Sequence, residues 1–478
     1  MSLLFPRLNF ADDALALRVG DDVLSYAALA ARAGGFAASL ADAGIVRGDR
    51  VGVFSDAHPN TVVAMMGAIA AGVTVVPLNP KLGSKERGHI LKDSAPKRVY
   101  SAIAREVEGV EVEPILAREA PLPRRETVGG EVLVLYTSGT TGLPKGAILR
   151  DTQIAANIDG LAEAWAWTDD DVVVHALPLF HVHGLVLGLF GSLRVGGALW
   201  TFERFDVDAV ADALAGAGTM FFAVPTMHHR WASAAEEDST IADKMKSARL
   251  LISGSAGLPV REHRRIEALI GRAVFERYGL TETLINCAVP DKRGPMPGTV
   301  GFPLRGVELR LVDDARNVLD CHDGTTIGEI AVRGPSVFGG YLGRQDATAA
   351  AMDDEGWFYT GDLATRDEEG AIRIMGRRSV DLIKTGGYKV GAGEVEACIL
   401  EVEGVAECAV VGVPDADLGQ RIEAHLVCRE GANVDPKVVV DRVASELTPH
   451  KRPRAVHFVD ALPRNAMGKV QKKRLLPS

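Results

Sequence analysis

The sequence predicts an α/β protein in which a large N-terminal domain, made of two doubly wound α/β subdomains plus a β-barrel-like subdomain, precedes a small mobile α+β C-terminal domain. Three observations carry this prediction. Strand-like and helical runs alternate over the first 300 or so residues, alternating strands take over from about residue 301, and a Gly-rich hairpin followed by an amphipathic helix opens near residue 380. We predict domains at 1–376 and 381–478, joined by a hinge at 377–380.

The alternation in the first part favours largely parallel sheets covered by helices. Apolar runs bounded by turn residues predict strands within 50–55, 73–78, 172–179, 218–225 and 248–254. Apolar residues at helical spacing predict helices within 60–72 and 206–218.

The later part of the chain has the period-two pattern of antiparallel strands. Strands are predicted within 307–314, 328–334 and 371–376, which together give the barrel-like subdomain. Beyond them, "DLIKTGGYKVGAGEVEACIL" predicts the hairpin and helix of the C-terminal domain, and "ECAVVGVP" predicts a further strand.

Composition excludes several classes of protein. The 478 residues are 47% hydrophobic and 24% charged, which predicts a soluble globular chain. The net charge of −10 argues against nucleic-acid binding, and the five scattered cysteines favour a reducing cytoplasm. The N-terminal stretch has no secretory pattern, and Pro77 and Pro80 interrupt the uncharged run 61–80, so we expect neither a leader nor a membrane span. We expect a monomer.

The stretch "YTSGTTGLPKG" at 136–146 predicts a phosphate-binding loop. Its glycines bring backbone N–H groups close to an anion, and its hydroxyls and one ammonium supply further donors. Pro144 and Gly146 exclude the Walker loop, which continues directly into a helix. A flexible linker is the alternative, and the apolar runs on both sides argue against it. The predicted phosphate-binding residues are Thr137, Ser138, Gly139, Thr140, Thr141, Gly142 and Lys145.

Five further stretches accompany this loop in a fixed order: "LPLFHVHGL", "ERYGLTET", "YTGDLA", "GRRSVDLIKTGGYKVGAGEVE" and "PRNAMGKVQKKRL". Together they resemble the adenylate-forming superfamily, and specifically the acyl-CoA synthetases. "VPTMHHR" and "SGSAGLP" add a resemblance to the bacterial malonyl-CoA and methylmalonyl-CoA synthetases. The resemblance implies that malonate or methylmalonate reacts with ATP, assisted by Mg²⁺, to give an acyl-adenylate and pyrophosphate. Coenzyme A then displaces AMP.

The resemblance also implies roles for individual residues. The implied catalytic residues are Lys469, His181, Thr281 and Glu282. The carboxylate of Glu282 is a hard oxygen ligand of the kind that binds Mg²⁺. Residues implied to contact the nucleotide are Ser255, Ala256, Gly257, Glu276, Arg277, Tyr278, Gly279, Asp362 and Arg377, and those implied to border the entry of coenzyme A are Gly386, Gly387 and Tyr388.

A second carboxylate on the substrate requires a buried cation and hydrogen-bond donors. The residues implied to contact the acyl group are Arg230, Ser255, His183 and Ile285, with Arg230 as the expected buried cation. The resemblance implies that His181 gates the pocket, whereas His183 could equally be a satisfied structural residue.

Two positions depart from the family pattern. Ser379 stands where hinges commonly carry Asp or Lys, and Gly257 replaces a bulkier residue. Three alternative functions remain open: another short-chain, medium-chain or aryl acyl-CoA ligase, an amino-acid-activating domain, and a catalytically silent binding module.

Overall fold

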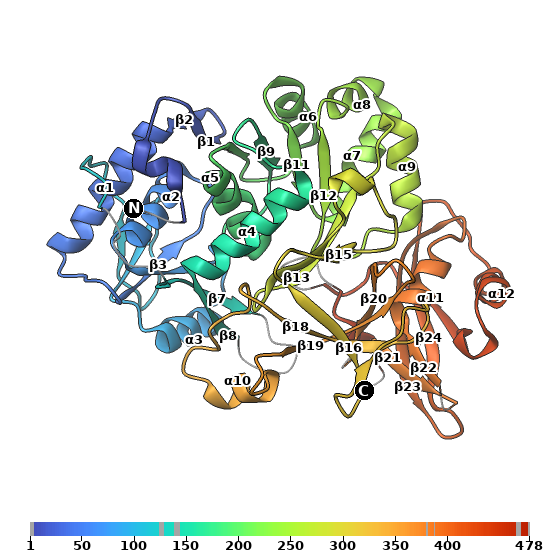
Figure 1. The fold of residues 1–478 in the computed structure, drawn as a ribbon. Coiled ribbons are helices and arrows are strands. Elements are labelled where there is room, and N and C mark those ends of the chain that lie inside the picture. The colour runs from blue at the N-terminus through green and yellow to red at the C-terminus, as the bar shows by residue number, and fades with distance from the viewer. Residues whose placement is uncertain are drawn as a thin grey trace.

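The computed structural model describes residues 4–123, 129–137, 144–378, 381–386, 388–464 and 470–476. Figure 1 shows a large α/β body and, beside it, a smaller unit built from the C-terminal part of the chain. This is the predicted division of the fold. The hinge itself stays a prediction, because 379–380 lie outside the described residues.

The first subdomain is built on a six-stranded sheet with the order β6-β5-β3-β4-β7-β8. Its pairs are parallel except for β7–β8, which flank the predicted phosphate loop and pair antiparallel. The strands are β3 Arg50–Phe54, β4 Thr74–Leu78, β5 Arg98–Ser101, β6 Val112–Pro114, β7 Glu131–Thr137 and β8 Lys145–Arg150. Its helices are α1 Tyr26–Asp42, α2 Pro59–Ala70 and α3 Ser84–Ser94, preceded in the chain by the 3₁₀ turn η1 Pro6–Phe10.

The second subdomain is built on a nine-stranded sheet with the order β15-β14-β13-β12-β11-β9-β10-β1-β2. The central pairs from β13 to β1 are parallel, and both edges are antiparallel. The strands are β1 Leu15–Val19, β2 Asp22–Ser25, β9 Val172–His175, β10 Ala198–Thr201, β11 Met220–Ala223, β12 Leu250–Ser253, β13 Phe275–Leu280, β14 Leu284–Ala288 and β15 Phe302–Pro303. The helical segments are α4 Asp151–Trp165, the π-helical η2 His183–Gly191, α5 Ser192–Val195, α6 Val207–Gly216, α7 Pro225–Glu237, α8 Ser239–Met245, α9 Val260–Ile270 and η3 Asp291–Arg293.

The two remaining sheets confirm the predicted change from largely parallel to largely antiparallel strands. The third is an antiparallel sheet with the order β17-β16-β18-β19-β20, open at β17 and β20 among the described strands. It comprises β16 Glu308–Val312, β17 Val318–Leu319, β18 Gly328–Arg333, β19 Phe358–Arg366 and β20 Ile372–Arg377, with α10 Gln345–Ala351 between β18 and β19. The C-terminal sheet comprises β21 Leu382–Thr385, β22 Tyr388–Gly391, β23 Val405–Asp415, β24 Gly419–Cys428 and β25 Ala455–Phe458, with α11 Ala392–Ile399, α12 Pro436–Glu446, η4 Pro449–Lys451 and η5 Lys472–Leu475.

The cores follow the same division. One large apolar cluster runs through both α/β subdomains and into the third sheet, whereas the C-terminal unit has a cluster of its own around Val395, Val410 and Leu426. A unit with its own core has the anatomy of a separate domain.

The uncharged run 61–80 forms the buried helix α2 and the buried strand β4, as expected. Within the described ranges, no helix has both the length and the apolar character needed to cross a membrane.

Candidate active site

The candidate site lies where strands of the nine-stranded sheet end and the third sheet approaches them. In sheets of parallel strands, the carboxyl ends of the strands form the usual ligand crevice. Here the hairpin β13–β14 reaches β19 through a side-chain hydrogen bond, and the loop after β12 lies against β13. Residues far apart in sequence therefore meet at one edge.

The hairpin β13–β14 positions the "LTET" segment. Gly279 approaches its partner strand so closely that a Cβ there would lie 1.9 Å from the carbonyl oxygen of Leu284, so only glycine fits. Leu284 itself takes a left-handed backbone conformation with φ of 55°. The resulting turn buries Glu282 and leaves Thr281 half-buried.

Glu282 is tied to the end of the phosphate-loop hairpin through Tyr341. The Tyr341 hydroxyl donates to Oε1 of Glu282 over 2.7 Å, and Nζ of Lys145 lies 4.3 Å from the centre of the Tyr341 ring. Burial, and then the Glu282 carboxylate, raise the pKa of Tyr341, so the phenol remains a proton donor at neutral pH. The structure thus brings two predicted residues, Lys145 and Glu282, onto one aromatic ring.

Asp362 joins three of the residues predicted to contact a nucleotide. Its carboxylate accepts from the Tyr278 hydroxyl over 2.7 Å and from Nε of Arg377 over 3.0 Å. Asp362 and Tyr278 are buried, while Arg377 is half-buried at the end of β20. This acceptor is held by two strands from different sheets.

Glu276 and the loop after β12 form the next wall. The Glu276 carboxylate accepts from the Leu258 amide over 2.9 Å and lies 3.0 Å from Nε2 of His263, so it braces the loop. Ser255, Ala256 and Gly257 are exposed on that loop, and Ser255 has a left-handed backbone with φ of 71°. A Cβ added at Gly257 would meet nothing within 4 Å. The loop therefore has room for a bulkier side chain at position 257.

The two predicted histidines are neutral. Burial lowers the pKa of His181 to about 4, and it lowers that of His183 further, with help from the positive charge of Arg277. His183 begins the π-helical segment η2, and its ring stacks on Phe222 with centroids 6.1 Å apart. Both of its ring nitrogens lack a hydrogen-bond partner among the described residues.

Sequence reasoning missed two further buried histidines. His175 on β9 and His228 on α7 are fully buried, and burial lowers the pKa of each to about 4. Both make backbone hydrogen bonds, to the Leu177 amide and to the Ile252 carbonyl. Each histidine has apolar residues at the spacing of its own strand or helix in the sequence, and this pattern could have predicted that it is buried.

The arginines are placed differently from what the sequence suggested. Arg230 is exposed on α7, and its guanidinium lies 5.5 Å from the centre of the Phe205 ring, so the expectation that it is buried is wrong. Arg277, predicted to contact the nucleotide, is the buried cation. A Cβ on Gly254 would lie 2.3 Å from its Cζ, which places the guanidinium under the loop that carries Ser255.

No acidic side chain among the described residues forms an ion pair with Arg277. Its Nε and one terminal nitrogen have no hydrogen-bond acceptor in the part of the chain that the structure describes, and burial lowers its pKa to about 10. Three more polar side chains, at the end of β12 and on the β13–β14 hairpin, are buried with unpartnered atoms among the described residues: Ser253, Thr283 and Asn286. Buried polar groups are normally satisfied, so these atoms can form hydrogen bonds with a ligand or with water.

The other predicted site residues make fewer contacts with this cluster or lie outside the described residues. Ile285 is fully buried in β14, and its backbone exchanges hydrogen bonds with the side chain of Asn157. Gly386 has φ of 56°, and the exposed Tyr388 stacks on His450 of the same domain at 4.0 Å. Thr137 ends β7 and donates to the Lys145 carbonyl. Ser138, Gly139, Thr140, Thr141, Gly142, Gly387 and Lys469 lie outside the described residues.

Comparison with solved structures agrees with this geometry. The chain is 37% identical to ATP-bound MatB from Rhodopseudomonas palustris, with a TM-score of 0.90 over 99% of this chain and 98% of that one. It is 48% identical to a malonyl-CoA ligase in a ternary product complex with methylmalonyl-CoA and AMP, with a TM-score of 0.74 over 96% of this chain and 100% of that one.

Comparison by sequence gives the same grouping. The mitochondrial malonate–CoA ligase of Homo sapiens is 33% identical over 91% of this chain and 83% of its own length. The AMP-binding enzyme model matches residues 8–342, and the AMP-binding enzyme C-terminal domain model matches residues 394–469. The chain therefore belongs to the AMP-binding enzyme family.

Proposed function

We propose that this protein ligates malonate or methylmalonate to coenzyme A at the expense of ATP, through an acyl-adenylate, releasing AMP and pyrophosphate. It is an AMP-forming acid–CoA ligase. The observation that supports the dicarboxylate substrate best is Arg277, a buried guanidinium without a carboxylate partner among the described residues, beside the residues proposed to hold the nucleotide.

A buried, unpaired charge is unfavourable unless a ligand neutralises it. A monocarboxylate has only the one carboxylate, which reacts at the α-phosphate, and it leaves Arg277 unpaired. Malonate offers a second carboxylate, and a guanidinium can hold it through two parallel hydrogen bonds. Ser255 and the neutral His183 would add hydroxyl and imidazole contacts, and Arg230 would attract the anion from the rim.

The nucleotide would be held by the residues joined through Asp362. The carboxylate of Asp362 would accept hydrogen bonds from ribose hydroxyls, and its bonds from Arg377 and Tyr278 hold it in place. The loop 137–145 would supply backbone and hydroxyl donors to the phosphates.

Mg²⁺ fits the donor set around Glu282. The carboxylate is buried, and the Tyr341 hydroxyl fixes its Oε1. One carboxylate together with phosphate oxygens is the usual environment of this ion, which neutralises phosphate charge when bound. Thr281, half-buried in the same turn, would donate to the α-phosphate.

The first half-reaction joins two anions, so it depends on cations fixed in advance around the reacting phosphate. Lys145 and, by resemblance, Lys469 would provide them. In the second half-reaction, the thiol of coenzyme A attacks the acyl carbonyl of the adenylate, and AMP leaves. Gly386, Gly387 and Tyr388 would border its approach, which requires the C-terminal domain to turn at 377–380 between the two steps. His181 would gate the acyl pocket.

A substrate screen tests the proposal. ATP- and CoA-dependent pyrophosphate release should be measured with acetate, propionate, malonate, methylmalonate, octanoate and benzoate. Malonate and methylmalonate are expected to exceed propionate at least tenfold in kcat/KM, because charge-assisted hydrogen bonds are worth about 1.5–3 kcal/mol. Equal turnover of propionate would contradict the dicarboxylate assignment, and activity with octanoate or benzoate alone would favour another acyl-CoA ligase.

We also propose a monomer working in the cytoplasm. The described cysteines are all free thiols, which suits a reducing compartment.

A further inference from the structure

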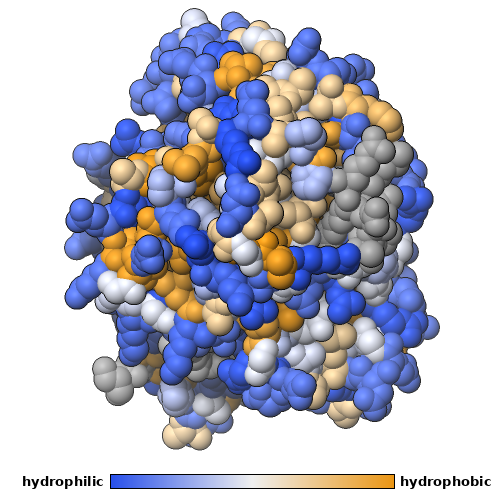
Figure 2. Space-filling view, turned by 90° about the vertical axis from the view of Figure 1, so that its left-hand side faces the viewer, coloured by the Kyte–Doolittle hydropathy of each residue, from blue (hydrophilic) through white to orange (hydrophobic). Residues whose placement is uncertain are grey.

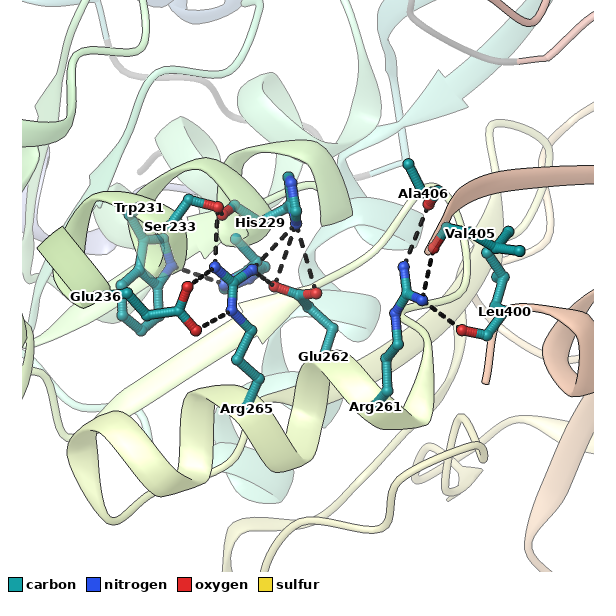
Figure 3. Close-up of polar contacts among 11 residues, drawn as sticks. His229, Trp231, Ser233, Glu236, Arg261, Glu262, Arg265, Leu400, Val405 and Ala406 are labelled. Carbon is teal, nitrogen blue, oxygen red and sulfur yellow. Dashed lines mark hydrogen bonds and ion pairs between the residues drawn. The ribbon is translucent and has the colours of Figure 1, made fainter. Parts of the chain in front are cut away.

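Two arginines of helix α9 reach the C-terminal domain, and Arg261 makes the closer contacts, whereas Arg264 makes only a 3.8 Å ion pair with Glu401. Arg261, in the first turn of α9, is half-buried and donates to three main-chain carbonyl oxygens of the C-terminal domain. The acceptors are Leu400, Val405 at 2.8 Å and Ala406 at 3.2 Å. Figure 3 shows the guanidinium leaving α9 toward these residues.

The acceptors are well suited to a cation. Leu400 is the C-cap of α11, where unpaired carbonyls carry the negative end of the helix dipole. Val405 begins β23. Arg261 therefore bonds both to the end of α11 and to the start of β23.

Helix α9, which carries Arg261, is itself bonded to helix α7. Four residues further along α9, Arg265 forms a bidentate pair with Glu236 of α7, at 2.7 and 2.6 Å, and also donates to Glu262 and Ser233. Figure 3 shows Arg265 and Arg261 on one helix, pointing to α7 and to the C-terminal domain respectively. Because α9 is pinned to α7, Arg261 acts from a fixed position.

In the arrangement that Arg261 holds, Tyr388, proposed to border the entry of coenzyme A, is exposed to solvent and stacks on His450 within its own domain. This structure also superposes on the ATP-bound relative with a TM-score of 0.90 and on the product complex with a TM-score of 0.74, although the second is closer in sequence.

We propose that Arg261 is a positioning residue that latches the C-terminal domain in the arrangement that forms the adenylate, and that its three hydrogen bonds break before coenzyme A reacts. This inference rests on the proposed function, because it assumes two half-reactions that need different placements of the domain. It adds a residue that is not proposed to touch ATP, the dicarboxylate or coenzyme A.

Two measurements test the latch. Dyes attached through non-canonical amino acids at the exposed positions 267 and 430 report the distance between the domains and leave the native cysteines in place. Single-turnover assays then follow adenylate formation from ATP and malonate, and separately the reaction of prepared malonyl-adenylate with coenzyme A.

Arg261→Ala is expected to broaden the interdomain distance distribution and to slow adenylate formation about tenfold, the effect of losing roughly one charge-assisted hydrogen bond net of solvation. Reaction of the prepared adenylate should keep its wild-type rate or become faster. Arg261→Lys should fall between, because a single ammonium cannot reach three divergent carbonyls.

Arg264→Ala is the matched control. Arg264 lies on the same helix with a largely exposed side chain and makes one 3.8 Å ion pair with Glu401, so its loss should leave both readouts near wild type. An unchanged distance distribution in Arg261→Ala, or equal slowing of both half-reactions, would overturn the latch. Failure of the wild type to use malonate would overturn the proposed function instead, and the distance measurement would still decide on Arg261.

Discussion

Replacing Arg277 with methionine should make the protein more stable and less active at once. Burial lowers the pKa of this guanidinium to about 10, between two and three powers of ten below that of a solvated arginine. Each power of ten corresponds to ~1.4 kcal/mol, so keeping the charge in place costs the folded state ~3 kcal/mol without an anion. Methionine has a similar length and no charge, and it recovers part of this cost.

The expected gain in the free energy of unfolding of the substrate-free protein is therefore about 1–3 kcal/mol, measured by urea denaturation. The same change should lower kcat/KM for malonate about 10²–10³-fold, because a buried ionic contact is worth about 3–5 kcal/mol when one partner is removed. Propionate, which has no second carboxylate, should lose less than about threefold.

Two comparisons separate the possible explanations. Arg305→Met removes an exposed arginine that pairs with Glu163 at 2.9 Å, and it should change neither stability nor activity appreciably. Arg230→Met tests the residue that the sequence favoured. If Arg277→Met keeps its activity on malonate while Arg230→Met loses it, the distal carboxylate belongs to Arg230 and the reasoning from burial is refuted.

Four further outcomes are expected. Tyr341→Phe removes the donor to Glu282, and it should raise the KM for MgATP about tenfold or more in pyrophosphate-release assays, with an unchanged KM arguing against a metal role for Glu282. Asp362→Asn should weaken ATP binding at least about tenfold by calorimetry, because the acceptor for Arg377 becomes neutral, and full ATP affinity would remove it from the nucleotide site. Burial lowers the pKa of His181 to about 4, so between pH 6.5 and 4 the unfolded chain binds a proton that the folded chain does not, and the free energy of unfolding falls as the pH falls. His181→Asn should reduce the slope of the free energy of unfolding against pH by about one proton, measured by urea titrations at several pH values. An unchanged slope would mean that His181 is protonated in the folded protein. Lys469→Ala, at a position outside the described residues, should slow adenylate formation about 10²–10³-fold yet still convert prepared malonyl-adenylate to malonyl-CoA, and loss of both steps would contradict the two-state mechanism.

Much of the fold could be predicted from local patterns. Runs such as those of β3, β4, β11 and β12 are buried on both faces of parallel sheets, so they are continuously apolar and stand out in the sequence. The antiparallel strands after residue 301 were predicted from alternation; β16 and β20 are partly exposed, whereas β18 is buried at all but its last residue.

The candidate site was harder to predict where it depends on which way a side chain faces. The motifs named Tyr278, Asp362 and Arg377, and the structure joins them. No pattern within the "VPTMHHRW" helix shows that Arg230 faces outward, because that depends on the neighbours of α7. Tyr341 lies outside every motif, and it reaches Glu282 because the segment after β18 pairs with β8, where Tyr341 lies opposite Ala147.

The acceptors of Arg261 are all main-chain oxygens. A contact of this kind does not depend on the side chains of residues 400–406, so these residues can change during evolution while the backbone path is kept. C-terminal domains exchanged between relatives should therefore dock correctly as long as α11 ends and β23 begins at the same place. Inserting or deleting one residue in the turn between them should harm such a chimera more than replacing every side chain there.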